Sequence, residues 1–261
     1  MPWQVAAAGI WVNNQNVSLS VLTQYANIVI SLMPKYDRFR MVFSERWWTW
    51  QPFYWNGFRS TPYYTMCVKA DSVEAVLPSI SKKRRERINR GKRKYRIDTD
   101  NTSFKTYWDF LKSSYEDRGR HLDYGEEKFY RLFTALEEHN ACQIRSVYDQ
   151  DRLVAVNIML VDEEKYYHQF GAQMKKTDSS ATSYAVYDAI CSAVNSGKVF
   201  DFEGSMIQGV CEFNSSFNPK WETQYLIESY SARYILIDSI RKIGNVIKES
   251  ISPRYRKRSN I

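Results

Sequence analysis

The sequence predicts an α+β fold in which a mixed sheet is flanked by helices. Segments whose apolar residues alternate with polar ones, as in strands, are interspersed with segments of helical period. Three of the strand-like segments follow one another across short polar connections, as antiparallel hairpins do. The chain has 261 residues, 44% of them apolar and 15% aromatic, which is enough to bury a substantial core.

The clearest pattern covers residues 94–231, where strand-like and helical segments follow in a regular order. Ser103 is a suitable N-cap, and Gly119 and Gly197 are suitable helix ends. A mixed sheet with helices on both faces satisfies this order. The predicted elements are a strand (94–100), two helices (103–119, 126–140), three antiparallel strands (142–149, 152–162, 165–173), a helix (179–197), a strand (198–204), a short helix (208–217) and a strand (222–232).

The first 93 residues are less regular. Residues 21–33 have helical spacing before Pro34, and 39–45 and 63–70 alternate like strands. The Trp-rich segment 46–65 is more typical of a packing interface than of a surface that stacks on bases, because aromatic side chains bury large areas. The predicted domains are residues 1–93, which include a basic helix, residues 94–233, and residues 234–261, an amphipathic helix with a basic tail.

Positive charge is concentrated in residues 82–96, which hold ten Lys and Arg residues and the single acidic residue Glu86. This segment carries +9 in a chain whose total is +8. Because like charges repel, the cluster favours an anionic partner: the phosphates of a lipid-linked or nucleotide-linked glycan, an anionic membrane surface, or tRNA. The cationic tail 253–261 adds weight to the membrane surface.

No window reaches the roughly 18 uninterrupted apolar residues of a membrane span, and the first residues lack the basic lead of a secretory signal. We therefore expect a cytoplasmic protein, in peripheral contact with the inner membrane face through residues 82–96. The four cysteines are widely spaced and far from the three histidines, which predicts reduced core thiols and no metal site.

The stretch FDFEGSMIQGVCEFNSSFNPKW, residues 200–221, predicts a functional site. An apolar strand ends on Asp201 and Glu203, and Gly204-Ser205 follows before a short helix. A glycine there lets the backbone approach a ligand, and a carboxylate at a strand exit can accept a proton. The alternatives are a solvated strand end, a cap for the next helix, or a salt bridge to an arginine.

Four segments resemble one family: QPFYWNGFRST, SKKRRERINRGKRKY, SSYEDRGRHLDY and above all FDFEGSMIQGVCEFNSSFN. They are similar to the Fem-like branch of the GNAT superfamily. This branch comprises acyltransferases related to the aminoacyltransferases of peptidoglycan cross-bridges, and includes stand-alone bacterial polysaccharide-associated acetyltransferases. The resemblance covers about residues 50–230. It implies two GNAT-like lobes, a degenerate one at 1–93 and a donor-holding one at 94–233.

The resemblance has two departures from the family pattern. The cross-bridge enzymes resemble F-K-x-x-F-G where this chain has FNSSFN, so that Asn214 replaces a basic residue and Asn218 replaces a glycine. A cation that grips a tRNA end is therefore missing from the motif. The N-terminal lobe is also short for the family.

The resemblance implies a reaction as well as a fold. The acyl donor would lie between the strands 166–172 and 198–203, with its carbonyl polarised by a backbone N–H while an amine attacks. The expected activity moves an acyl group, in particular acetyl, from acyl-coenzyme A to an amine of a cell-envelope glycan or its precursor. The alternatives are a tRNA-dependent aminoacyltransferase and an inactive binding protein of glycan assembly.

Several residues follow as site candidates. Glu203 would accept the proton of the incoming ammonium, and Tyr184 would protonate a leaving thiolate, although its spacing equally suits core packing. His168 is either a cleft-lining base or a buried hydrogen-bonded histidine, and Arg118 is either an acceptor contact or a helix C-cap. The complete acceptor set is Arg118, Trp55, Arg59 and Asp201, and the catalytic set is Glu203, Ser205, Tyr184 and His168.

The donor's phosphates are expected where the helix at 179–197 begins, because free N–H groups and the helix dipole favour anions. The glycine-rich loop of ordinary coenzyme A users is absent there, so a polar loop with a hydroxyl cap is the alternative. The predicted donor contacts are Gly171, Ala172, Lys175, Lys176, Ser179 and Ser180.

Overall fold

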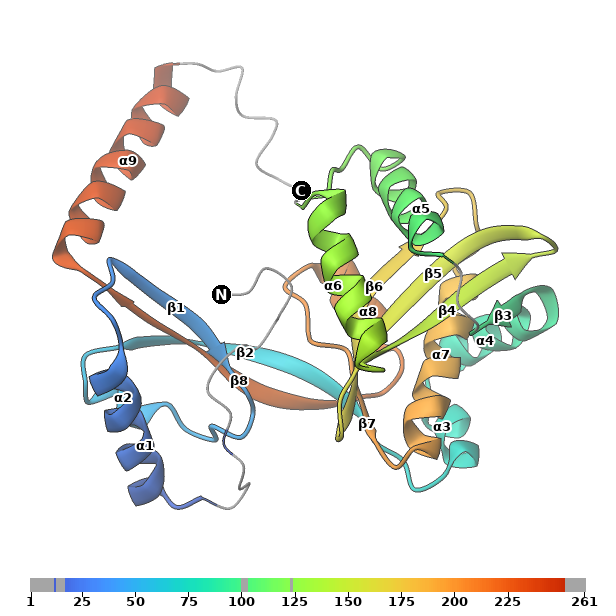
Figure 1. The fold of residues 1–261 in the computed structure, drawn as a ribbon, viewed down its shortest axis with the longest axis horizontal. Helices are drawn as coiled ribbons and strands as arrows, with labels where there is room; N and C mark the ends of the chain where they lie inside the picture. Colours follow the sequence, from blue (N-terminus) through green and yellow to red (C-terminus); the bar gives the residue numbers. More distant parts are fainter. Residues whose placement is uncertain (1–11, 13–16, 100–102, 123, 252–261) are drawn as a thin grey trace. The chain divides into compact units, whose positions relative to one another are not determined.

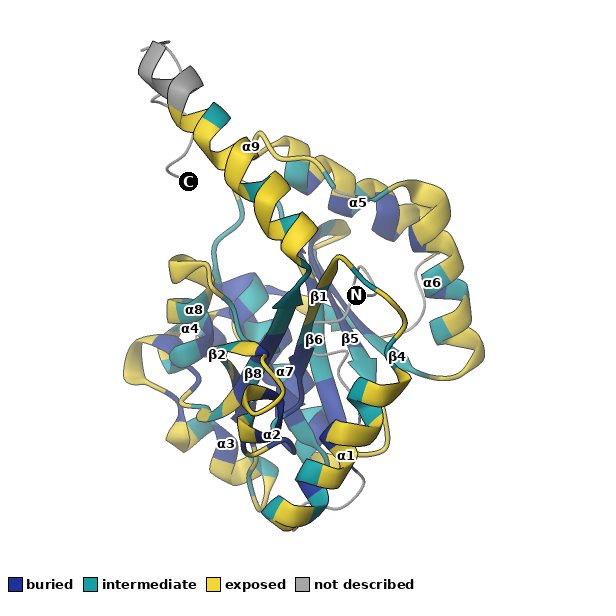
Figure 2. Cartoon of the chain, turned by 90° about the vertical axis from the view of Figure 1, so that its left-hand side faces the viewer, coloured by how far each residue is buried: buried dark blue, intermediate teal, exposed yellow. Residues whose placement is uncertain are grey.

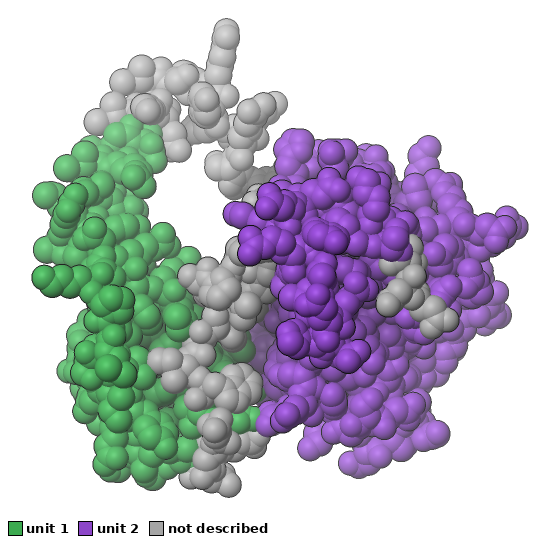
Figure 3. Space-filling view, viewed as in Figure 1, with its two compact units in different colours: residues 1–63, 223–261 green, residues 64–222 purple. Residues whose placement is uncertain are grey.

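The computed structural model describes residues 12, 17–99, 103–122 and 124–251, with side chains as far as Val246. The chain forms two compact units (Figure 3). Unit 1 consists of Met1–Tyr63 and Thr223–Ile261, and unit 2 of Tyr64–Glu222. The basic helix, which the sequence groups with residues 1–93, thus belongs to unit 2. The tail 253–261 lies outside the described residues.

Unit 2 contains a mixed sheet (Figure 1). Within it β6 and β7 are parallel, and the other pairs with described registers are antiparallel. The predicted mixed sheet and both hairpins are confirmed. In spatial order the strands are the end of β2 (Arg59–Val68), β7 (Val199–Asp201), β6 (Lys165–Gln173), β5 (Arg152–Val161), β4 (Cys142–Asp149) and β3 (Arg96–Asp98).

Helices cover both faces of this sheet. Val156 and Ile158 of β5 pack in the core of α5 (Phe104–Glu116) and α6 (Glu126–Glu138). The neighbouring Ala155 and Met159 pack instead against α7, as alternation along a strand requires. The remaining helices of the unit are α7 (Ser180–Asn195), α3 (Val73–Ser79) and α4 (Lys82–Lys94), which both pack on α7, and α8 (Gln208–Ser215).

The predicted helix boundaries have the expected chemistry. The Ser103 side chain accepts a hydrogen bond from the Thr106 N–H at the start of α5. Gly119 follows α5 with φ +67° and Gly197 follows α7 with φ +68°, the left-handed conformation that glycine adopts most easily. Local sequence therefore determines where these helices begin and end.

Some cations of the basic helix α4 make contacts within unit 2. Arg84 is 6% exposed, donates hydrogen bonds to the hydroxyls of Ser183 and Ser216, and lies 4.2 Å from the Phe213 ring centroid. Burial lowers the pKa of Arg84 to about 10. Lys92 lies 4.3 Å from the Tyr187 ring centroid. These contacts give part of the basic segment a structural role that needs no anionic partner.

Unit 1 has its own strand pair and aromatic core. β1 (Arg38–Phe43) pairs antiparallel with residues 225–230 of β8 (Lys220–Tyr230). Phe43, Trp47 and Phe53 pack with ring centroids 5.0 to 5.3 Å apart. The Trp-rich segment thus contributes to a packed core, although Trp48 and Trp55 are exposed. The helices of this unit are α1 (Leu19–Leu32), α2 (Gln51–Tyr54) and α9 (Ala232–Ile251).

The helix α9 is exposed along most of its described length (Figure 2). Within the described part of the chain, no helix combines the length and apolar content that crossing a bilayer requires.

Candidate active site

The parallel ladder between β6 and β7 is short. It joins residues 165–167 to residues 199–201 and extends no further. Beyond Tyr167, β6 continues beside β5, whereas the chain after Asp201 turns to β2, where the Phe202 N–H donates to the Met66 carbonyl. The two strands therefore diverge at the point where Glu203 follows, which is the separation that the sequence predicts.

A β-bulge lies on β6 next to this divergence. Ile158 of β5 opposes Phe170, but the next residue, Met159, opposes His168, so Gln169 is the extra residue. A bulge interrupts the ladder and changes the direction of nearby backbone groups, and bulges are common beside active sites.

Glu203 and Gly204 have unusual backbone conformations. Their φ values are +57° and +65°, and for a residue with a side chain this conformation costs about 1–2 kcal/mol. A Cβ atom on Gly204 would collide with the Tyr64 carbonyl oxygen, so this position requires glycine. The Glu203 N–H donates to Asp201 Oδ1 at 2.8 Å. Two contacts therefore hold the Glu203 backbone in its strained state.

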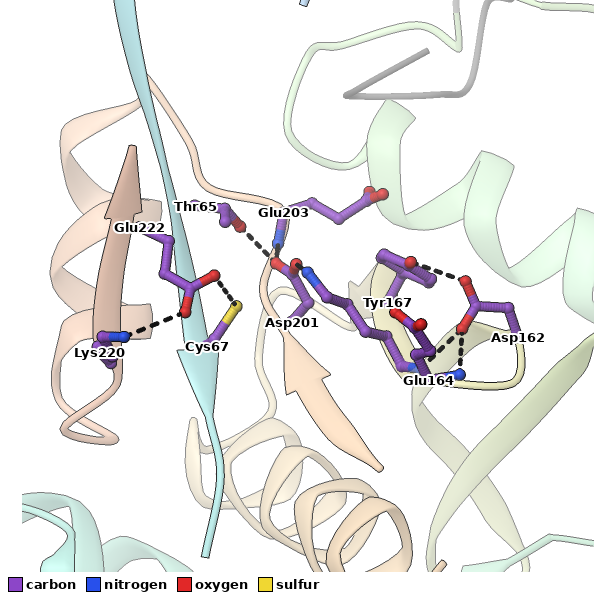
Figure 4. A network of polar contacts seen from close by, with 10 residues as sticks. Thr65, Cys67, Asp162, Glu164, Tyr167, Asp201, Glu203, Lys220 and Glu222 are labelled. Atoms are coloured by element: carbon purple, nitrogen blue, oxygen red, sulfur yellow. Dashed lines mark hydrogen bonds and ion pairs between the residues drawn. The ribbon is translucent and has the colours of Figure 1, made fainter. Parts of the chain in front are cut away.

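Asp201 is the centre of a buried polar network (Figure 4). It is 2% exposed, and its Oδ2 lies 3.0 Å from Lys165 Nζ in an ion pair buried on both sides. The Thr65 hydroxyl donates to Oδ1, the oxygen that also accepts from the Glu203 N–H. Because its oxygens are engaged within the chain, Asp201 holds Glu203 in place, and the predicted acceptor contact would require it to leave this network.

Glu203 is the site's proton-accepting candidate. Burial, assisted by the charge of Asp201, raises the pKa of its carboxyl to about 8, and the cation of Lys165 opposes this shift. Figure 4 shows its side chain directed away from Asp201. Among the described residues its carboxylate has no hydrogen-bond partner. A base with a pKa near 8 suits the deprotonation of an ammonium at neutral to mildly alkaline pH.

His168 is held in the sheet. Its Nε2 lies 3.0 Å from Asn157 Oδ1, and its ring packs 6.1 Å from the rings of Phe200 and Phe202. Burial lowers the pKa of His168 to about 4, so the ring is neutral at physiological pH. This is the buried hydrogen-bonded alternative. Gly171 lies against the hydrogen-bonded pair of His168 and Asn157, and a Cβ there would lie only 3.0 Å from Asn157 Oδ1.

Four further candidates have contacts within unit 2. The Ser205 hydroxyl accepts from the Ile207 N–H before α8, and Ala172 is buried against α5 and α6. Arg118 donates to the carbonyl oxygens of Ser114 and Gln173, at 2.6 Å each, as in the C-cap alternative. Tyr184 is half-buried on the side of α7 that faces α4, and burial raises its pKa.

The start of α7 differs from the expected anion site. Ser180 is 0% exposed, and a Cβ on Gly91 would lie 2.5 Å from its carbonyl oxygen, so it packs directly beneath α4. Its N–H already donates a hydrogen bond to Asp178 Oδ1 and so does not point at an outside ligand. Ser179 remains half-exposed, but its side chain makes no capping hydrogen bond. The carboxylate of Asp178 occupies the position expected for a phosphate.

A hollow of about 680 Å³ lies beside this loop, at the end of the β4–β5 hairpin. Lys175, Lys176 and Arg152 contribute exposed cations to its lining. Lys94 also lines it, but its Nζ is paired with Asp149 at 3.2 Å. The predicted lysines thus border this hollow, whose lining also includes Asp117, Asp149 and Asp178.

Trp55 and Arg59, the remaining candidates, belong to unit 1, where both are exposed. Sequence reasoning missed Lys165 and Thr65. Neither lies in a motif, and each meets Asp201 only through long-range pairing. A lysine at the start of an otherwise buried strand is the one available signal for Lys165.

Comparisons with known proteins find similarity to one family model and to several solved structures. Residues 78–206 match the family model described as acetyltransferase (GNAT) domain. Among solved structures, FemX is similar over 84% of this chain and 79% of its own, with 13% identity and a TM-score of 0.63. No curated protein sequence matches the chain.

Two other solved structures share the fold. One is the C-terminal domain of a putative lysylphosphatidylglycerol synthetase from Agrobacterium fabrum, 12% identical over 83% of this chain and 75% of its own, with a TM-score of 0.51. The other is a conserved protein of unknown function from Bacteroides thetaiotaomicron VPI-5482, 13% identical over 67% of this chain and 62% of its own, also with a TM-score of 0.51.

Proposed function

We propose that this chain is a GNAT acyltransferase that moves an acyl group, in particular acetyl, from acyl-coenzyme A to an amine of a cell-envelope glycan or its precursor. The match of residues 78–206 to the GNAT domain and the fold shared with FemX support this proposal. The proposal rests mainly on the position and the raised pKa of Glu203. Its half-buried carboxyl has a pKa raised to about 8, and it lies where β6 and β7 diverge.

The reaction needs one base and one fixed geometry. The amine nitrogen attacks the thioester carbonyl carbon, a C–N bond forms and the C–S bond breaks. The Glu203 carboxylate takes the proton that the ammonium must lose, and the departing thiolate takes a proton from solvent. Asp201 keeps the Glu203 backbone in position, and Lys165 holds the Asp201 side chain through an ion pair of 3.0 Å. Positioning of this kind supplies most of the rate enhancement that such transfers require.

The donor assignment is supported by the hollow beside the β6–α7 loop. Lys175, Lys176 and Arg152 give it three exposed cations that would pair with the phosphates of coenzyme A. A specific ligand raises the melting temperature of the protein it binds. We expect acetyl-coenzyme A or a longer acyl-coenzyme A to raise it, and Lys175→Glu with Lys176→Glu to weaken this shift.

The transfer itself is tested with the acyl-coenzyme A that raises the melting temperature. The rate of thiol release from it is measured in the presence of amino sugars, free and nucleotide-linked. Glu203→Gln should lower the rate by about 10²-fold or more, the usual contribution of a general base. Lys128→Glu, an exposed charge change on α6, is the matched control and should leave it unchanged. If no acyl-coenzyme A shifts the melting temperature, the donor assignment fails.

A tRNA-dependent aminoacyl transfer is the second candidate, and the exposed cations of α4 favour it. Lys82, Lys83 and Arg93 are exposed on that helix. Charged tRNA would then raise the melting temperature where acyl-coenzyme A does not, and ribonuclease would abolish the activity.

A further inference from the structure

The helix α9 (Ala232–Ile251) turns its apolar residues away from the rest of unit 1. The described apolar side chains of its first three turns are 47–63% exposed. They are Ile235, Leu236, Ile237, Ile240 and Ile243. A surface helix of a globular protein normally buries such a face against its own core. This helix does the reverse.

The polar side of α9 contacts the rest of unit 1. The Tyr234 ring stacks on Tyr230 at 5.2 Å, and the Arg38 guanidinium lies 5.9 Å from the same ring. Asp238 is 29% exposed and pairs with Lys242 at 2.8 Å. Its pKa is lowered mainly by the Lys242 hydrogen bond and further by Arg241 and Arg38. Tyr234 therefore anchors the helix, and the apolar face points outward.

We propose that this apolar face of α9 lies on an anionic lipid membrane, with the helix parallel to the surface. Charge is the first argument for this occupant. Residues 232–261 carry +6 in a chain whose total is +8, and residues 252–261 include four cations and no acidic residue. Arg241 and Lys242 lie on the helix at the two borders of the apolar face. Lys242 pairs with Asp238 but is 76% exposed, so both side chains would reach phosphate groups while the face enters the acyl boundary.

The width of the face is the second argument. Leu236, Ile240 and Ile243 follow the spacing of a coiled-coil seam, but Ile235 and Ile237 extend the apolar surface on both sides of it. At about 100° per residue the five side chains span about 200° of the helix. A two-helix seam is narrower, whereas an interfacial helix uses an arc of this width. The surface therefore suits a bilayer better than a second copy of the chain.

The test uses the full chain and sedimentation with vesicles of phosphatidylcholine alone or with added phosphatidylglycerol. The wild-type protein should sediment with the anionic vesicles and be released by high salt. Ile240→Asp with Ile243→Asp should lower the partition coefficient by about tenfold or more. Ile28→Asp with Leu32→Asp, which charges two exposed apolar residues of α1 in the same unit, is the matched control and should retain binding.

Each outcome decides the proposal. Failure of the wild-type protein to bind anionic vesicles overturns it, as does equal loss in both double variants. A dimer in light scattering that dissociates in the α9 variant, without vesicle binding, would assign the face to a second copy. Ile240→Ser with Ile243→Ser, which removes the same apolar side chains without adding charge, should also bind anionic vesicles more weakly than the wild type. Agreement of the two α9 variants guards against misfolding of either one. The assay contains neither donor nor acceptor, so its result is independent of the proposed acyl transfer.

Discussion

Replacing Gly204 by alanine should damage the site more than the same replacement at another left-handed glycine. At Gly204, φ is +65°, and a Cβ would collide with the Tyr64 carbonyl oxygen of β2. At Gly197, φ is +68°, and the Cβ would meet nothing within 4 Å. The two variants share the conformational penalty and differ only in the collision.

The expected magnitudes follow from these two terms. The left-handed conformation costs an alanine about 1–2 kcal/mol, which is the whole loss expected for Gly197→Ala. For Gly204→Ala the β2 and β7 backbones must also separate, and overpacking of this kind costs about 1–3 kcal/mol more. We therefore expect a loss of about 2–5 kcal/mol in the free energy of unfolding, the sum of the two contributions.

Urea unfolding followed by circular dichroism measures both losses from the shift in midpoint at constant slope. Gly204→Ala should also lower the transfer rate by about 10²-fold, because it displaces the Glu203 backbone, whereas Gly197→Ala should not. Equal losses of stability in the two variants would refute the claim that Gly204 is fixed by its approach to Tyr64.

Three further predictions concern the charged groups of unit 2. The pKa of Glu203 is raised to about 8 from its ordinary value of 4.5, so the folded state binds this proton more tightly than the unfolded state does. The group therefore destabilises the fold increasingly as pH rises from about 4.5 to 8. Glu203→Gln should be more stable than wild type at pH 8, by about 2 kcal/mol or more, and equal to it at pH 4.5, as measured by urea unfolding at the two pH values. Lys165→Met removes the cation that opposes this shift, so the alkaline rise of the pH–rate profile should move to higher pH, and an unmoved profile would argue against their coupling. Arg84→Ala should cost about 2–4 kcal/mol in unfolding free energy, because its hydroxyl partners and the Phe213 ring lose their contact, and the exposed Lys83→Ala should cost less than about 0.5 kcal/mol; similar losses would contradict the buried role.

The regular part of unit 2 was predictable from local pattern. The helices α5, α6 and α7 and the strands β4, β5 and β6 each have a clear period, and Gly119 and Gly197 mark helix ends because only glycine adopts their φ values easily. Hairpin connections too short for a crossover fixed the antiparallel pairing. The carboxylates at the exit of β7 were predictable for the same reason, since the end of an apolar strand is visible in the sequence.

The rest depends on contacts between distant residues. Thr65 and Asp201 are 136 positions apart, and no local pattern indicates that they share a hydrogen bond. The cluster of cations at 82–96 suggested an anionic partner, yet Arg84 is buried over an aromatic ring because α4 packs between α7 and α8 residues. Ser180 has the sequence of a helix start, but the small Gly91 lets α4 approach closely enough to cover it.

The most direct test of the account is the pH dependence of kcat/KM for acyl transfer by the wild-type protein and Glu203→Gln. The wild-type value should rise with an apparent pKa near 8, the titration of the Glu203 carboxyl in the free enzyme. The glutamine variant should be slower by about 10²-fold or more and lack that rise. A variant that keeps both the rate and the rise near pH 8 would contradict the assignment of Glu203 as the base.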